Sequence, residues 1–323
     1  MLERRSSLTL GDLSGVHERM NTEVQRNINQ HLGLPPSTQP ISQRATQLLR
    51  YRQFLNSISN QHEGIYQQTT LADLQSSIQY KHWRAARSSL LVLHGSNHPS
   101  IPNISQSWLS LAAMDLVNNL LNDDDNVPGR IVCWHICSNT ETLEYALSQV
   151  MSQLMGSNPT VLRRESTQQL IESSLVPPRD SDDSGDDEEE EESEHAASRT
   201  RAVRSQRKVL EGRLDAMAAF IRRCRGRPVY LVIDRPEQCT NASDGNMWRF
   251  VRRMLQLVTG TASSNSESGD ESGVELRVLM VVRKEFWNVE DRISSLAGSE
   301  LGPNGLKPGQ FLVLRRDQDY VHR

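Results

Sequence analysis

Short apolar runs alternate with amphipathic stretches along most of the chain. Five runs have the leucine-, isoleucine- and valine-rich composition of strands buried on both faces: 90–93, 131–136, 229–234, 276–282 and 311–314. Between the runs, apolar residues recur at helical spacing, which predicts helices at about 106–121, 143–154, 161–175, 210–221 and 247–258. Strands separated by helices need crossover connections. The pattern therefore predicts an α/β domain with a mostly parallel sheet and helices on both faces.

Two segments precede this domain, which we place at 88–323. Residues 1–41 are polar and interrupted by prolines, so we expect a disordered arm. Residues 42–87 carry apolar positions spaced for two or three helices, and Trp83 is placed to dock the last of them on the next domain. The sequence thus predicts a disordered arm, a short helical segment and an α/β domain, in that order.

Composition adds a second disordered region inside the domain. The hydrophobic share is 36% and the mean hydropathy is −0.57, both low for a chain that is folded throughout. The segment at about 176–206 is acidic and then rich in serine and arginine, and it includes eleven acids between 180 and 194. Without those acids the net charge of −4 becomes −4 + 11 = +7. We interpret this segment as a solvated, disordered insertion.

Other features bear on the compartment. No apolar run approaches the roughly 20 residues needed to span a bilayer. The first residues lack the apolar core of a secretory signal. The four cysteines all lie in or beside apolar segments, which favours reduced, buried thiols, and Cys133 and Cys137 have poor spacing for a metal site. We expect an intracellular, cytoplasmic protein.

The first apolar run ends in a loop that is typical of nucleotide-binding domains in position but not in composition. A phosphate-binding loop needs glycines, then lysine and serine or threonine at the start of the next helix. Here the loop extends from Gly95 to Ser105, contains Pro99 and Pro102, and has no lysine. The two prolines also remove two amide donors. Efficient hydrolysis of a nucleotide is therefore not expected.

Two later strand ends match other parts of such a domain. The run at 229–234 ends in Asp234, a common position for a Mg²⁺-holding carboxylate, with Glu237 shortly after it. The run at 276–282 is followed by Arg283, which could sense a γ-phosphate. Each signal is weakly specific by itself, because many strands end in an acid or an arginine. They become informative because they follow successive predicted strands in the order that a nucleotide-binding α/β domain would have.

Together these three strand ends resemble the fungal STAND-type NTPases, the NACHT or nephrocystin-3-like N-terminal class. Members carry Asp-Ala-Leu-Asp-Glu-Cys after one strand, where this chain has Asp234-Arg-Pro-Glu237-Gln238-Cys239. The resemblance implies a P-loop NTPase-like fold and a vestigial nucleotide site of Gly95, Ser105, Asp234, Glu237 and Arg283. Gln238 replaces the family's catalytic glutamate. The missing lysine and this replacement together imply a catalytically impaired relative.

The leading interpretation is a pseudo-NTPase that acts by protein–protein association or in signalling, with other proteins or further copies of itself as partners. No cofactor is expected. An alternative is a weak ATPase or GTPase that holds Mg²⁺ and ATP through Asp234, with Arg130 or Arg283 in place of lysine. A second alternative is polyanion or nucleic-acid binding by the arginines and lysine between 199 and 208. Few aromatic residues accompany those cations, so nucleic acid ranks last.

Overall fold

The structure, a computed structural model, describes residues 26, 30, 41–61, 69–97, 107–122, 129–158, 191–224, 226–262, 275–289 and 309–316. For residues 41–43, 191–206 and 261–262 it describes the backbone only. Nearly all of the expected arm, the expected helix at 161–175 and the acidic residues up to 190 lie outside the described residues.

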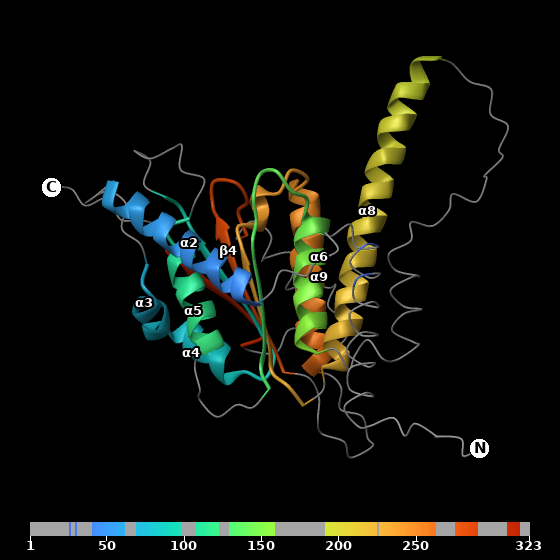
Figure 1. Cartoon of the computed structure of the whole chain (residues 1–323). Coiled ribbons are helices and arrows are strands. Elements are labelled where there is room, and N and C mark those ends of the chain that lie inside the picture. Colours follow the sequence, from blue (N-terminus) through green and yellow to red (C-terminus); the bar gives the residue numbers. More distant parts are fainter. Residues whose placement is uncertain are drawn as a thin grey trace, which may run out of the picture.

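The five apolar runs form one sheet that is parallel throughout (Figure 1). The strand order is β2-β3-β4-β1-β5. The strands are β1 (Ser89–Gly95), β2 (Ile131–Ile136), β3 (Val229–Asp234), β4 (Leu276–Arg283) and β5 (Phe311–Arg315). This arrangement confirms the α/β fold predicted from the sequence. Because all strands run the same way, their carboxyl ends share one edge of the sheet, where ligands bind in open α/β sheets.

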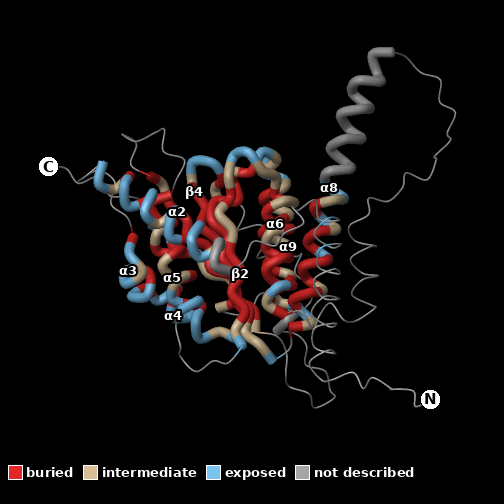
Figure 2. Tube along the Cα trace, viewed as in Figure 1, coloured by how far each residue is buried: buried red, intermediate tan, exposed pale blue. Residues whose placement is uncertain are grey.

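Helices cover both faces of the sheet, as predicted (Figures 1 and 2). The helices α6 (Leu143–Ser157), α8 (Glu191–Arg223) and α9 (Asp244–Ala262) cover one face. The other face carries α2 (Ile41–Gln61), α3 (Leu71–Ser76), α4 (Ile78–Ala85) and α5 (Ser110–Asn122). Successive residues of β1 alternate between the two cores: Leu90 and Val92 pack on the first face, Leu91 and Leu93 on the second.

The helical segment ahead of β1 is part of the second layer. It forms three helices, and Trp83 at the end of α4 is fully buried against the sheet. The indole Nε1 donates a hydrogen bond to the backbone oxygen of Val278 in β4, at 3.0 Å. This confirms the predicted docking of Trp83. The short α3 begins with a capping box in which Thr70 and Asp73 exchange hydrogen bonds.

The helix α8 differs from the sequence expectation. We expected a helix from about 210 and disorder up to 206, whereas α8 begins at Glu191. Residues 191–206 contain no glycine or proline and are rich in glutamate, alanine and arginine, which are strong helix formers. Helix propensity therefore extends an amphipathic helix whose buried half starts at Leu210.

Among the described residues, no helix has the length and apolarity to cross a bilayer.

Candidate functional site

Four of the five residues expected at the nucleotide site lie at the carboxyl edge of the sheet. Gly95 ends β1 and pairs in register with Arg283, which ends β4. Asp234 ends β3 and pairs with Val281 of β4, and Glu237 follows in a short 3₁₀ helix, Pro236–Gln238. The fifth, Ser105, lies outside the described residues. The strand order thus brings residues distant in sequence to one edge.

Protein groups surround the buried carboxylate of Asp234. Its Oδ1 accepts a hydrogen bond from the hydroxyl of Ser110 at 2.7 Å. Its Oδ2 accepts one from the phenol of Tyr51 at 2.9 Å and one from Nε of Arg235 at 3.2 Å. Burial raises the pKa of Tyr51 well above its ordinary value, and the charge of Asp234 raises it further, so the phenol remains a donor. Three donors, from α2, from α5 and from the residue that follows β3, therefore contact the carboxylate.

Arg235 adopts an uncommon backbone conformation to make these contacts. Its φ of 58° and ψ of 53° lie in the left-handed region, which is strained for a residue other than glycine. The guanidinium turns back on Asp234, donates to the backbone oxygen of Cys137 at 3.2 Å, and lies 5.7 Å from the ring centroid of Tyr51. Burial alone would lower its pKa, but Tyr51, Asp234 and Glu237 more than offset this effect and raise it. Arg235 is thus a fixed buried cation paired with Asp234.

Ser110 is the site residue that the sequence reasoning missed. In a phosphate-binding loop the hydroxyl residue that faces the Mg²⁺-holding acid comes directly after the lysine. Ser110 contacts Asp234 from the first turn of α5, so by analogy with such a loop the residue corresponding to the lysine would be Leu109. The Leu109 side chain is buried and packs in the core of the second layer. The signal was available: a serine opening the helix after the first strand, preceded by an apolar residue.

Gly95 is required by packing at the end of β1. The chain leaving β5 runs alongside it, and the backbone N–H of Arg316 donates to the oxygen of His94 at 2.9 Å. A Cβ on Gly95 would collide with the carbonyl oxygen of Arg316 and approach the side chain of Leu109 to 3.3 Å. The glycine therefore permits the close approach of two backbones.

Glu237 lies close to the buried pair of Asp234 and Arg235, and its carboxyl has a strongly raised pKa. Burial raises the pKa of its carboxyl to about 8, an effect that Arg235 and backbone hydrogen bonds only partly offset. Its Oε1 accepts a long hydrogen bond, 3.4 Å, from the backbone N–H of Arg283. Oε2 has no hydrogen-bond partner among the described residues. At neutral pH the carboxyl is mostly protonated, which suits a site that already contains one buried ion pair.

The arginines considered as replacements for lysine are not placed alike. Arg283 is at the correct edge, but its side chain is buried, 3.4 Å from Glu285 and 4.7 Å from the ring centroid of Phe286. Arg130 directly precedes β2 and therefore lies at the opposite edge of the sheet, where the strands begin. Each residue of β2 adds about 3.3 Å to the distance between Arg130 and the carboxyl edge. The structure thus contradicts the use of Arg130 at this site.

All four cysteines are buried free thiols, as expected. Burial raises the pKa of Cys133, Cys137 and Cys224, so none of these three has the low pKa of a reactive nucleophile. Cys137 directly follows β2, and with His135 and Glu141 it forms a polar group beside the Asp234 network.

The arginine-rich segment gives little support to a polyanion site. Of its basic side chains the structure describes Arg207 and Lys208, both exposed. Nε of Arg207 lies 3.0 Å from Oε1 of Glu211, an ion pair one helical turn along α8. Arg207 therefore already has a partner of opposite charge within its own helix.

Comparison of the chain with protein-family models, with curated proteins and with solved structures gives no match in any of the three. The geometry of the site, and the motifs that resemble an NTPase domain, are therefore what a functional proposal rests on.

Proposed function

We propose that this chain is a catalytically impaired NTPase-like module of the STAND or NACHT type that acts through protein–protein association and does not turn over nucleotide. The observation that carries the proposal is the state of Asp234. A carboxylate that holds Mg²⁺ needs an open side toward the metal, whereas Tyr51, Ser110 and Arg235 direct three donors at this one. Asp234 here stabilises a buried cation.

Two residues near Asp234 in the sheet topology, Leu109 and Gln238, support the same conclusion. Phosphoryl transfer depends on positioning and on cations that neutralise the phosphate oxygens. Leu109, in the position of the lysine, contributes apolar packing instead, and Gln238 in place of a glutamate cannot act as a general base. What remains of the domain is a well-packed scaffold, which suits a role in binding other proteins.

The alternative is a weak ATPase or GTPase in which Asp234 exchanges its present donors for Mg²⁺. That exchange would have to displace Tyr51 and Arg235 and leave the guanidinium buried without its partner, which is costly. Phosphate release from ATP and GTP separates the two functions. We expect the purified protein to release no phosphate above the background without enzyme. Release that depends on Mg²⁺ and falls in Asp234→Asn would favour the alternative and contradict the proposal.

Association can be tested on the same preparation. Light scattering after size-exclusion chromatography gives the mass of the protein with and without Mg²⁺ and ATP. If the module associates without using nucleotide, the mass is the same in both conditions. A change in mass on adding nucleotide would show that the site still controls assembly, and the proposed independence from nucleotide would be lost.

A further inference from the structure

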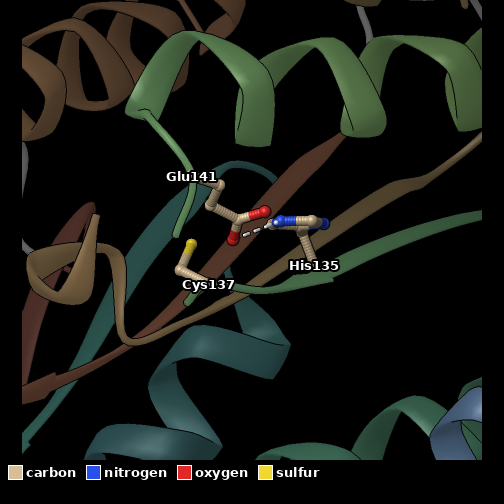
Figure 3. A group of neighbouring side chains, drawn as sticks. All are labelled: His135, Cys137 and Glu141. Carbon is tan, nitrogen blue, oxygen red and sulfur yellow. Dashed lines mark hydrogen bonds and ion pairs between the residues drawn. The ribbon is translucent and has the colours of Figure 1, made fainter. Parts of the chain in front are cut away.

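A second cluster of chemically competent side chains lies beside the Asp234 network, which contacts it through the hydrogen bond from Arg235 to the backbone oxygen of Cys137. His135 is in β2, Cys137 follows that strand, and Glu141 lies in the turn before α6. Figure 3 shows the three side chains pointing toward one another. One ligand atom from each, a ring nitrogen, a thiol sulfur and a carboxylate oxygen, lies within 4.8 Å of the other two.

Local structure places these atoms together. Residues two apart at the end of a strand point to the same face, which brings His135 and Cys137 to one side. The turn then returns Glu141, whose Oε1 accepts the backbone N–H of Ser138 at 2.7 Å and lies 3.0 Å from Nε2 of His135. The imidazole is also flanked by Tyr145, with ring centroids 6.5 Å apart. The sequence interpretation considered Cys137 only with Cys133 and so missed this group.

We propose that His135, Cys137 and Glu141 form a binding site for a borderline-soft divalent cation, with Zn²⁺ as the ion of best fit. Imidazole, thiolate and carboxylate are the three ligand types that Zn²⁺ takes in proteins. For three atoms that are all within 4.8 Å of one another, a central point lies at most about 2.8 Å from each, against Zn²⁺ bond lengths of about 2.0–2.3 Å. Side-chain shifts of about 0.5–0.8 Å close this difference.

The surroundings suit such a site. The side chains of His135 and Glu141 are 14% and 13% exposed, which leaves a path from solvent, while Cys137 is fully buried. The thiol of Cys239 is a hydrogen-bond partner of the Cys137 thiol. The backbone oxygen of Glu141 accepts hydrogen bonds from the N–H and hydroxyl of Thr240, at 2.8 and 3.1 Å. A bound ion would therefore strengthen a junction between the end of β2 and the loop after β3.

Cobalt(II) titration of the purified, reduced chain tests the site. We expect one equivalent of Co²⁺ to produce a thiolate-to-cobalt charge-transfer band and visible bands of a low-coordinate ion, and one equivalent of Zn²⁺ to abolish them. Removing a ligand should weaken binding at least as much as removing a supporting group, about 10–100-fold. Cys137→Ser and Glu141→Gln should each do so, and Cys137→Ser should also remove the charge-transfer band.

Cys224→Ser is the matched control, because Cys224 is another buried thiol, at the end of α8, outside the cluster. It should bind Co²⁺ like the wild type. Glu141→Gln keeps an oxygen that can accept from Ser138, so it remains informative if Cys137→Ser folds poorly, and circular dichroism reports folding for each variant. No saturable one-to-one binding by the wild type, or unchanged binding by folded Glu141→Gln, would overturn the proposal.

Discussion

The ends of β1 and β3 lie on the same edge of one sheet, yet they differ in opposite ways from the chemistry that a nucleotide needs. At the end of β3 the charged residues remain, and protein donors occupy them: Asp234 is held by Ser110, Tyr51 and Arg235. At the end of β1 apolar packing prevails, because Leu109 is buried and Gly95 admits the backbone of Arg316.

The difference teaches that an acidic residue at a strand end is by itself poor evidence for catalysis. An aspartate at a strand end has the same letter whether it holds a metal or a neighbouring arginine. Removing one member of a buried ion pair leaves an uncompensated charge, so the fold itself can require the residue whether or not it takes part in chemistry. The partners must be known before the residue is given a role.

Removing the charge at the end of β3 should have the largest effect. Asp234→Ala removes the ion-pair partner of the buried Arg235, and we expect it to lower the free energy of unfolding by about 3–5 kcal/mol. Urea unfolding followed by circular dichroism measures this. The control is Asp115→Ala, which breaks a partly exposed pair with Arg52 and should cost at most about 1 kcal/mol. Equal effects of the two variants would show that Asp234 has no structural role.

Protonation at the same end should make stability depend on pH. The pKa of Glu237 is about 8 in the folded protein against an ordinary 4.5, so the folded state holds a proton that the unfolded state releases. Its contribution is fully present below pH 4.5 and is lost as the pH rises to about 8. The loss is at most about 1.4 kcal/mol per pH unit.

Glu237→Gln, which is neutral throughout, should lack this dependence. Urea unfolding of both proteins at several pH values between about 4.5 and 8 gives the comparison. The difference in unfolding free energy between variant and wild type should change steadily through this window. Parallel profiles would mean that Glu237 titrates normally and is more solvated than the structure indicates.

Adding side-chain volume at the end of β1 should also destabilise the protein, but less than removing Asp234 does. Gly95→Ala places a methyl group against the carbonyl oxygen of Arg316, and overpacking of this kind costs about 1–3 kcal/mol. Gly260→Ala is the control, because no atom of another described segment lies within 4 Å of a Cβ added there in α9, and alanine favours a helix by about 1 kcal/mol. We therefore expect Gly95→Ala to lower the midpoint temperature of thermal unfolding and Gly260→Ala to raise it. A neutral Gly95→Ala would show that the end of β1 is not closely packed.

Most of the fold could be predicted from the sequence, because strands buried on both faces read as apolar runs and each run formed a strand. The start of α8 could not, since composition suggested disorder while helix propensity favoured a longer helix. At the site, the strand ends with Asp234 and Arg283 followed from the alternation of elements. Tyr51 could not be assigned, because its contact with Asp234 spans 183 residues and depends on how α2 packs.

The central claim, that protein groups and not nucleotide occupy the carboxyl ends of β1 and β3, is tested most directly by calorimetric titration of the purified chain with ATP and Mg²⁺. The account predicts no saturable binding tighter than about 100 μM, a limit that corresponds to about 5.5 kcal/mol. One-to-one binding of the metal–nucleotide complex below that limit would contradict it.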